Sequence, residues 1–209
     1  WISFARYMEL ALYTPGLGYY SGGAAKFGAA GDFVTAPQIS PLFGRVLARQ
    51  FAEALMQTGG SILELGAGSG LLAKQILDEL HAMGAAADYA ILEVSGDLRV
   101  RQQAQLAAYR GQVQWLETLP ETFTGVIFGN EVLDALPVHL IHWTEDGPQE
   151  RGVQVTGNSF VWQDRPIADP VLLQQAQSLA QPAGYVSEIG LAAPALIRTL
   201  AERLQSGLL

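Results

Sequence analysis

The stretch Ser61-Ile62-Leu63-Glu64-Leu65-Gly66-Ala67-Gly68-Ser69-Gly70-Leu71 decides the fold. A strand-like apolar run over residues 61–65 leads directly into a glycine-rich turn, and a helical pattern over residues 71–83 follows the turn. A strand that passes through such a turn into a helix is typical of ligand-binding α/β folds, because a glycine backbone can approach a ligand closely. We therefore expect a nucleotide-like ligand at the carboxyl end of this strand.

The spacing of the glycines excludes three related loops. A dinucleotide-binding loop needs its third glycine at position 71, where Leu71 stands, and a phosphate-binding loop needs Gly-Lys-Ser/Thr, whereas the nearest lysine is Lys74 inside the predicted helix. A hydrolase nucleophile elbow around Ser69 needs glycine at positions 67 and 71. The pattern that remains is an acid followed by G-x-G-x-G, and it indicates a methyltransferase loop that binds S-adenosylmethionine.

The chemistry of this donor suits the loop, because its methionyl end is a zwitterion beside a sulfonium cation. Glu64 is placed to attract the cationic end, and the first amides of the following helix are donors for the carboxylate. The loop residues expected to bind the donor through close backbone approach are Gly66, Ala67, Gly68 and Gly70.

A second anchor is expected at Glu93, late in the apolar run over residues 89–94. Neighbouring parallel strands end at the same edge of a sheet, so this carboxylate comes beside the glycine loop and can accept both ribose hydroxyls of the donor. The alternative is that Glu93 caps the next helix or is merely solvated. Trp115, which ends the run over residues 112–115, is also expected to contact the donor.

The third element is the stretch from Asn130 to Pro137, which follows the run over residues 125–129. Two acids and an amide at the tip of an apolar strand are hard to explain as core, so Glu131, Asp134 and Asn130 are the catalytic candidates, with Asn130 also a donor contact. The alternative is that Asn130 caps a helix and both acids are solvated.

The remaining pattern alternates short apolar runs with helical segments. The strands are predicted at 61–65, 89–94, 112–115 and 125–129, and the helices between them at 71–83 and 97–109. Apolar strands separated by helices indicate a mostly parallel sheet with helices on both faces and right-handed crossovers. We expect an α/β fold of the Rossmann-like class I methyltransferase type.

Two regions are added to this sheet. Helical patterns at 2–13 and 41–56 predict an N-terminal extension, so that residues 1–60 pack on a core formed by residues 61–209. Alternating residues predict a small antiparallel insertion at about 139–165, followed by helices at 171–180 and 195–204. Because Trp1 is no initiator and residues 207–209 resemble the start of a buried strand, we expect a fragment that lacks the C-terminal strands.

Composition narrows the class of partner. The 209 residues carry a formal charge of −8 and a pI near 4.8, which disfavours nucleic acid, and the chain has no cysteine for a thiolate metal site. Its apolar runs are shorter than the roughly 20 residues that span a bilayer, so we expect a soluble protein without membrane insertion. His139 and His142 lack metal-ligand companions and are expected to be structural.

With these residues in hand, the chain resembles the MidA family of methyltransferases over nearly its whole length. The resemblance covers Tyr7-Met8, Gly18-Tyr19-Tyr20, Gly31-Asp32-Phe33-Val34-Thr35-Ala36-Pro37, Ile39-Ser40, Phe43-Gly44, the glycine loop, Glu93-Val94-Ser95 and the stretch from Asn130-Glu131 to Pro137. The Gly-Asp-Phe loop and the Asn130 stretch are the most specific of these motifs.

The resemblance implies methyl transfer to a protein arginine, with S-adenosylhomocysteine as product. In mitochondrial relatives the substrate is a subunit of NADH dehydrogenase, so the resemblance implies complex I assembly and a mitochondrial matrix location there, and a cytoplasmic one in bacteria. Asp32 and Phe33 are then expected to close over the donor. Glu131 first and Asp134 second offset the guanidinium charge as its proton leaves.

Two positions depart from the family pattern. An acid is expected after Ala36-Pro37 and after Phe43-Gly44, where Gln38 and Arg45 stand and change a substrate contact or a helix partner. Two other functions therefore stay open: a non-catalytic assembly factor that keeps the fold, and a small-molecule methyltransferase, since the fold does not fix the acceptor. The sequence leaves the oligomeric state open as well.

Overall fold

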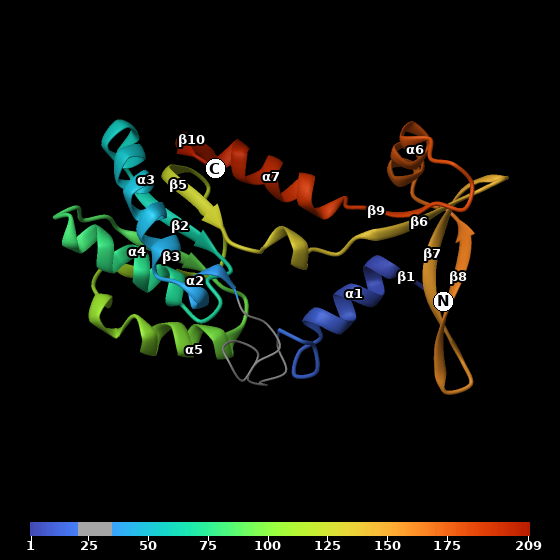
Figure 1. Ribbon diagram of the computed structural model, residues 1–209, viewed down its shortest axis with the longest axis horizontal. Coiled ribbons are helices and arrows are strands. Elements are labelled where there is room, and N and C mark those ends of the chain that lie inside the picture. The colour runs from blue at the N-terminus through green and yellow to red at the C-terminus, as the bar shows by residue number, and fades with distance from the viewer. Residues whose placement is uncertain (21–34) are drawn as a thin grey trace. The chain divides into compact units, whose positions relative to one another are not determined.

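The computed structural model describes residues 1–20 and 35–209. The chain divides into two compact units (Figure 1). The β unit comprises Trp1–Gly22 and Leu133–Ile197, and the α/β unit comprises Gly23–Val132 and Arg198–Leu209. In the part of the chain that is described, no helix has the length and apolar character needed to cross a membrane.

The α/β unit is built on a parallel sheet with the strand order β10-β5-β2-β3-β4. Its strands are β2 (Ser61–Leu65), β3 (Tyr89–Leu92), β4 (Val113–Leu116), β5 (Phe123–Gly129) and β10 (Leu204–Leu208). In the register, Leu65 lies beside Leu92 on one side and Gly129 on the other, and Leu92 lies beside Leu116. The carboxyl ends of four strands therefore meet along one edge.

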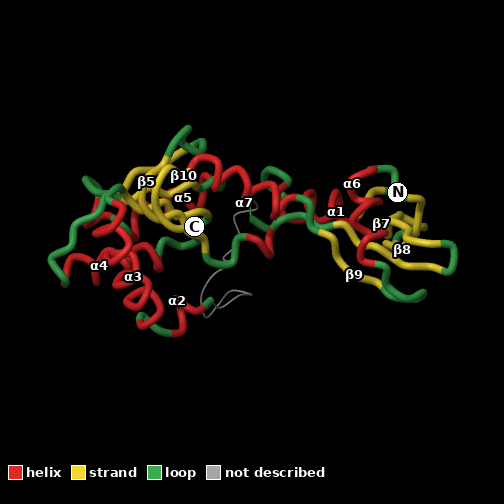
Figure 2. Tube along the Cα trace, turned by 90° about the horizontal axis from the view of Figure 1, so that it is seen from above, coloured by secondary structure: helices red, strands yellow, loops and turns green. Residues whose placement is uncertain are grey.

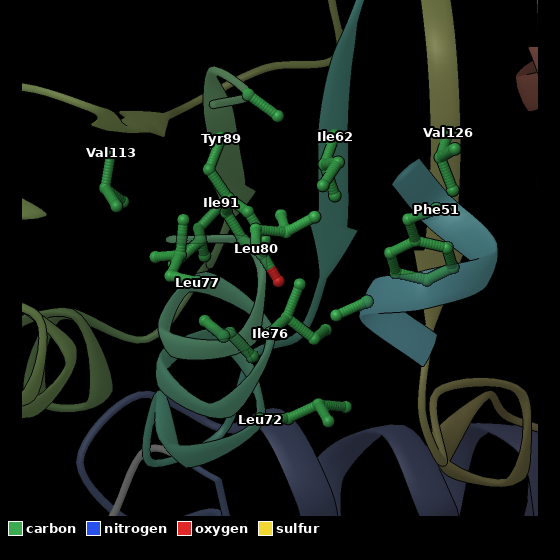
Figure 3. Close-up of a cluster of buried hydrophobic side chains, with 14 of the residues drawn as sticks. Phe51, Ile62, Leu72, Ile76, Leu77, Leu80, Tyr89, Ile91, Val113 and Val126 are labelled. Atoms are coloured by element: carbon green, nitrogen blue, oxygen red, sulfur yellow. The ribbon is translucent and has the colours of Figure 1, made fainter. Parts of the chain in front are cut away.

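One face of this sheet forms the main core with two helices, α3 (Leu42–Thr58) and α4 (Leu71–Ala82). Alternate strand residues such as Ile62 and Ile91 are fully buried there against Ile76 and Leu77 of α4 (Figure 3). In Figure 2 the strands β5 and β10 gather as a yellow block beside the red helices α3 and α4. Each such buried side chain contributes about 1.5–3 kcal/mol of hydrophobic stabilisation.

The opposite face of the sheet is also covered. Leu63 and Ile127, which alternate with the core residues along β2 and β5, are each 1% exposed. The remaining elements of the unit are α2 (Ala36–Ile39), α5 (Gly96–Gln105), the short helix η1 (Ala107–Tyr109) and the end of α7 (Ala192–Arg203), which crosses the division between the units. The predicted α/β methyltransferase fold with a parallel sheet is confirmed.

The β unit contains an antiparallel sheet in which β9 pairs with β6 and β6 pairs with β7, while β1 and β8 also pair with β7. Its elements are β1 (Ile2–Ser3), α1 (Phe4–Tyr13), η2 (Leu133–Ala135), β6 (His139–Thr144), β7 (Gly147–Thr156), β8 (Ser159–Pro166), α6 (Pro170–Leu179) and β9 (Val186–Ile189). A second core, separate from the first, joins β6, α6 and β9 through Ile141, Trp143, Leu172, Ala176 and Ile189.

The antiparallel region is larger than the insertion expected at 139–165, and the division of the chain differs from the expected boundary at residue 60. Strand β1 pairs with β7, and the rings of Phe4 and Tyr7 in α1 contact those of Trp162 and Phe160 in β8, tilted in the first pair and edge-on in the second. These pairings join the first residues to strands more than 140 positions later in the chain. Periodicity within one segment gives no sign of such long-range partners, which explains the difference.

Candidate donor-binding site

The glycine loop lies between the end of β2 and the start of α4. Gly66, Gly68 and Gly70 all have positive φ angles, of 60°, 54° and 80°. A Cβ on Gly70 would lie 3.3 Å from the Cα of Gln102 in α5, so this position is crowded as well as left-handed. The early third glycine of the G-x-G-x-G pattern therefore has a steric cause, which is the close approach of α5.

Glu64 is buried beneath this loop, with 2% of its surface exposed. Its carboxylate accepts a hydrogen bond of 2.8 Å from the hydroxyl of Tyr89, and its other electrostatic neighbour is the carboxylate of Glu93. Burial, opposed by the Tyr89 hydrogen bond and reinforced by the charge of Glu93, raises the pKa of Glu64 from 4.5 to about 8. A phenol and a second acid do not balance a buried charge, so Glu64 keeps its proton near neutral pH, and a cationic ligand would favour its ionised form.

Glu93 follows β3 directly, since the strand ends at Leu92 and not at the expected Val94. One carboxylate oxygen accepts from the backbone N–H of Ser95 at 2.9 Å, and the other accepts from the side-chain amide of Gln102 at 3.0 Å. Burial raises the pKa of Glu93, and these hydrogen bonds lower it. The alternative role as a helix cap does not hold, because Ser95 caps α5 through its hydroxyl.

Gln102 is a residue of this site that the sequence analysis missed. It is fully buried, and its side chain bonds to Glu93, to the carbonyl of Gly68 at 2.9 Å and to the indole N–H of Trp115 at 3.0 Å. A signal was present in the sequence: Leu98, Gln102 and Leu106 share one helical stripe, and a polar residue in an otherwise apolar stripe requires polar partners.

The turn after β5 folds back onto the glycine loop. A Cβ on Gly129 would lie 2.8 Å from Cγ2 of Val132, and one on Gly66 would lie 3.4 Å from the same atom. Glu131, just before Val132, is exposed and has a φ angle of 55°, which is rare for a residue with a side chain. Such left-handed conformations persist where the surroundings enforce them, and they occur often at functional sites.

The structure brings most of the predicted residues to one edge of the parallel sheet. Glu64, the loop Gly66-Ala67-Gly68-Ser69-Gly70, Glu93, Trp115, Asn130 and Glu131 lie at or next to the carboxyl ends of β2, β3, β4 and β5. Asp134 lies in η2 and belongs to the β unit, so the structure does not place it in this group. Asp32 and Phe33 lie outside the described residues.

The two departures from the family pattern both have structural partners. Arg45 pairs with Glu79 of α4 at 3.3 Å, and Arg49, one turn further along α3, pairs with the same carboxylate at 3.0 Å. The side chain of Gln38 accepts a hydrogen bond of 3.1 Å from the backbone N–H of Thr35 and so closes the first turn of α2. Gln38 therefore bonds within the first turn of its own helix, and Arg45 pairs with a neighbouring helix of the same unit.

The two strand histidines are engaged with acids inside the β unit. His139 lies 2.7 Å from a carboxylate oxygen of Glu150, and His142 lies 2.7 Å from Asp164. Arg151 binds the same Asp164 through two hydrogen bonds of 2.7 and 2.9 Å and lowers the pKa of that carboxyl. Among the described residues, no group of three or more potential ligands that could hold a metal ion is present.

Comparison with known proteins gives one family. A family model described as "Putative S-adenosyl-L-methionine-dependent methyltransferase" matches residues 46–209. The chain is 31% identical to the mitochondrial protein arginine methyltransferase NDUFAF7 of Danio rerio over 214 residues, which cover 85% of this chain and 50% of the relative. The Caenorhabditis elegans homologue is 31% identical over 184 residues, covering 74% and 43%. The chain thus spans about half the length of the curated relatives it matches.

Solved structures agree with this result. A crystal structure of a Burkholderia thailandensis protein bound to S-adenosyl-homocysteine superposes on this chain with a TM-score of 0.92. The two sequences are 46% identical, and the match covers 99% of this chain and 56% of the Burkholderia chain. A native crystal structure from the same organism, also 46% identical, has a TM-score of 0.88 and covers 99% and 55%. The fold, the family and the S-adenosylmethionine donor expected from the sequence are thereby confirmed, and the chain belongs to a family of S-adenosylmethionine-dependent methyltransferases.

Proposed function

We propose that this chain binds S-adenosylmethionine at the carboxyl edge of its parallel sheet and transfers the methyl group to an arginine of a protein. The observation that carries the donor site is the buried carboxylate of Glu64, whose neighbours Tyr89 and Glu93 supply no positive charge. The arginine acceptor is supported by the names of the NDUFAF7 relatives, which are called protein arginine methyltransferases.

In this proposal the donor is bound from both ends. Glu64 faces the cationic methionyl end, and the amides at the start of α4 bind its carboxylate. Glu93 accepts the ribose hydroxyls, since each carboxylate oxygen has two lone pairs and the bonds from Ser95 and Gln102 leave acceptor capacity. Trp115, with its indole held by Gln102, packs against the adenosine part of the donor.

The donor supplies a methyl group made electrophilic by the adjacent sulfonium. An arginine acceptor is protonated at neutral pH, because the pKa of a guanidinium lies above about 12. A carboxylate must therefore orient the guanidinium and offset its charge as the proton leaves. We assign this task to Glu131 first and to Asp134 second, with Asn130 orienting donor or acceptor. The strained backbone at Glu131 supports the order, because it fixes where that side chain begins.

Alignment contributes much of the rate in such a transfer. Holding two reactants in line supplies about 7–11 kcal/mol of the activation barrier. The protein therefore acts mainly by positioning, and a loop that covers the donor excludes water from the reacting atoms. The family resemblance implies this role for Asp32 and Phe33, which lie outside the described residues.

For the acceptor, we propose a protein substrate, with a subunit of NADH dehydrogenase as the first candidate. The location follows the organism: mitochondrial for eukaryotic relatives, as their names state, and cytoplasmic for a bacterial protein. A non-catalytic assembly factor is the main competing function, but Asn130 and Glu131 remain in place at the sheet edge. Gln38 and Arg45 no longer favour it, because both have ordinary structural partners.

The experiment that tests the acceptor is incubation of the full-length protein with methyl-labelled S-adenosylmethionine and a cell lysate. The labelled species are separated by size, and labelled protein is hydrolysed to its amino acids. We expect label in methylated arginine. Label in a small metabolite would overturn the arginine acceptor, and donor binding without any transfer would support the non-catalytic alternative.

A further inference from the structure

We infer that Gln102 is a positioning residue, which holds Glu93 in the orientation that accepts the ribose hydroxyls of the donor; this rests on the donor-binding role proposed above for Glu93. Gln102 does not reach the donor in this assignment. It acts through Glu93 and through the two other parts of the site that it touches.

The side-chain amide of Gln102 uses every hydrogen that it can donate. One Nε2 hydrogen goes to the carbonyl of Gly68 at 2.9 Å, and the other goes to a carboxylate oxygen of Glu93 at 3.0 Å. The amide oxygen accepts from the indole of Trp115 at 3.0 Å. Turning the amide over would place its oxygen against two acceptors, so the contacts fix a single orientation.

The three partners belong to three different elements of the site. Gly68 lies in the loop after β2, Glu93 follows β3, and Trp115 is on β4. One side chain on α5 thus links three segments that follow or end different strands and are separate in the sequence. Gln102 is also fully buried, and because an unpaired amide is costly away from water, conformations that break these hydrogen bonds are disfavoured.

Glu93 is fixed at both of its oxygens by this arrangement. Ser95 holds one oxygen through the backbone, and Gln102 holds the other through its side chain. The bond to Gln102 also lowers the pKa of Glu93, against the effect of burial, so it favours the charged form that accepts hydroxyls best. Without Gln102, the carboxylate keeps only the backbone hydrogen bonds of its neighbours Ser95 and Val94, and its link to the glycine loop and to Trp115 is lost.

The decisive test compares two ligands on two proteins. Full-length wild type and Gln102→Met are titrated by calorimetry with S-adenosylhomocysteine and with its 2′,3′-dideoxy analogue, which lacks the ribose hydroxyls. Methionine keeps the length of glutamine without its hydrogen bonds. We expect the wild type to bind S-adenosylhomocysteine about 100-fold more tightly than the dideoxy analogue. In the variant this ratio of affinities should fall about tenfold, which is the effect of losing one hydrogen bond to a charged group.

The ratio of the two affinities separates positioning from stability. A variant that is only less well folded weakens both ligands alike and leaves the ratio unchanged. Gln103→Met is the matched control, because Gln103 is the next residue on α5 and is exposed. If Gln102→Met is not recovered folded, Gln102→Leu takes its place, because leucine has no charge and no atom that donates or accepts a hydrogen bond.

Each outcome decides the matter. The positioning role is supported if the preference for S-adenosylhomocysteine over its dideoxy analogue falls in the Gln102 variant and persists in the Gln103 control. A preference that persists undiminished in the Gln102 variant overturns that role while leaving the assignment of Glu93 intact. A wild type that binds both ligands equally overturns the assignment of Glu93 and the positioning role with it.

Discussion

At the scale of single residues, the site is defined by acids that the fold keeps away from positive charge. Glu64 is buried beside a phenol and near a second carboxylate, and the pKa of Glu64 is about 8. The unfolded chain releases the same proton near its ordinary value of 4.5. The folded state therefore binds one more proton than the unfolded state between these values, and stability falls as the pH rises through this window.

Replacing Glu64 by glutamine removes this titration. We expect the Glu64→Gln protein, measured without donor, to gain stability relative to wild type as the pH rises from about 5 to 9, because only the wild type loses its buried proton. Thermal unfolding across this range measures the difference, with the exposed Glu53→Gln on α3 as control. Parallel curves for Glu64→Gln and wild type would show that Glu64 carries no raised pKa.

Glu131 is expected to act in transfer and not in donor binding. The Glu131→Gln protein should bind S-adenosylmethionine as the wild type does and lose about 100-fold or more in kcat, since glutamine cannot take up the guanidinium charge. Calorimetry and methyl-transfer rates on the full-length protein measure the two effects, with the exposed Glu145→Gln as control. A kcat within about threefold of wild type removes Glu131 from the reaction.

At the scale of elements, the sheet and its loops could be predicted well, and the contacts between elements could not. The apolar runs and the glycine spacing lie within short segments, so they predicted β2 to β5, α4 and the loop between them. The hydrogen bond from Gln102 to Gly68 and the ion pair between Arg45 and Glu79 each join residues 34 positions apart in the chain. Such partners depend on how the elements pack, which periodicity does not encode.

The pairing of β1 with β7 and the pairing of β9 with β6 are also contacts between distant segments that the sequence pattern does not predict. Strand β9 pairs with β6, which comes more than 40 positions earlier in the chain, and this partner is fixed only when the β unit forms. Asp134 shows the limit of prediction from sequence at the site. It is close in sequence to Asn130 and Glu131, but these two residues belong to the other unit.

The crowding of Gly70 gives an element-scale prediction. Gly70→Ala should lower the free energy of unfolding by about 1–3 kcal/mol, because its φ angle of 80° strains a side chain and its Cβ would press on Gln102. Gly96→Ala is the matched control at the start of α5, since a Cβ there meets nothing within 4 Å. Denaturant unfolding of both variants measures the effect, and equal stability of the two would contradict the packing of α5 on the loop.

At the scale of the whole molecule, the chain combines two units with different patterns of strands. One edge of the parallel sheet carries the residues to which we assign donor binding, and the antiparallel sheet carries aromatic and ionic side chains with its own core. The family gives the S-adenosylmethionine donor, whereas the arginine acceptor is a proposal that rests on the names of the relatives. The central claim is therefore that donor binding depends on the carboxyl edge of the parallel sheet.

The most direct test of that claim is calorimetry of the full-length Glu93→Ala protein with S-adenosylmethionine, beside Glu121→Ala, an exposed acid on the loop between β4 and β5. Because Glu93 is assigned to both ribose hydroxyls, we predict that Glu93→Ala loses about 100-fold in affinity or more, and that Glu121→Ala binds as the wild type does. Undiminished binding by a folded Glu93→Ala protein would contradict the account.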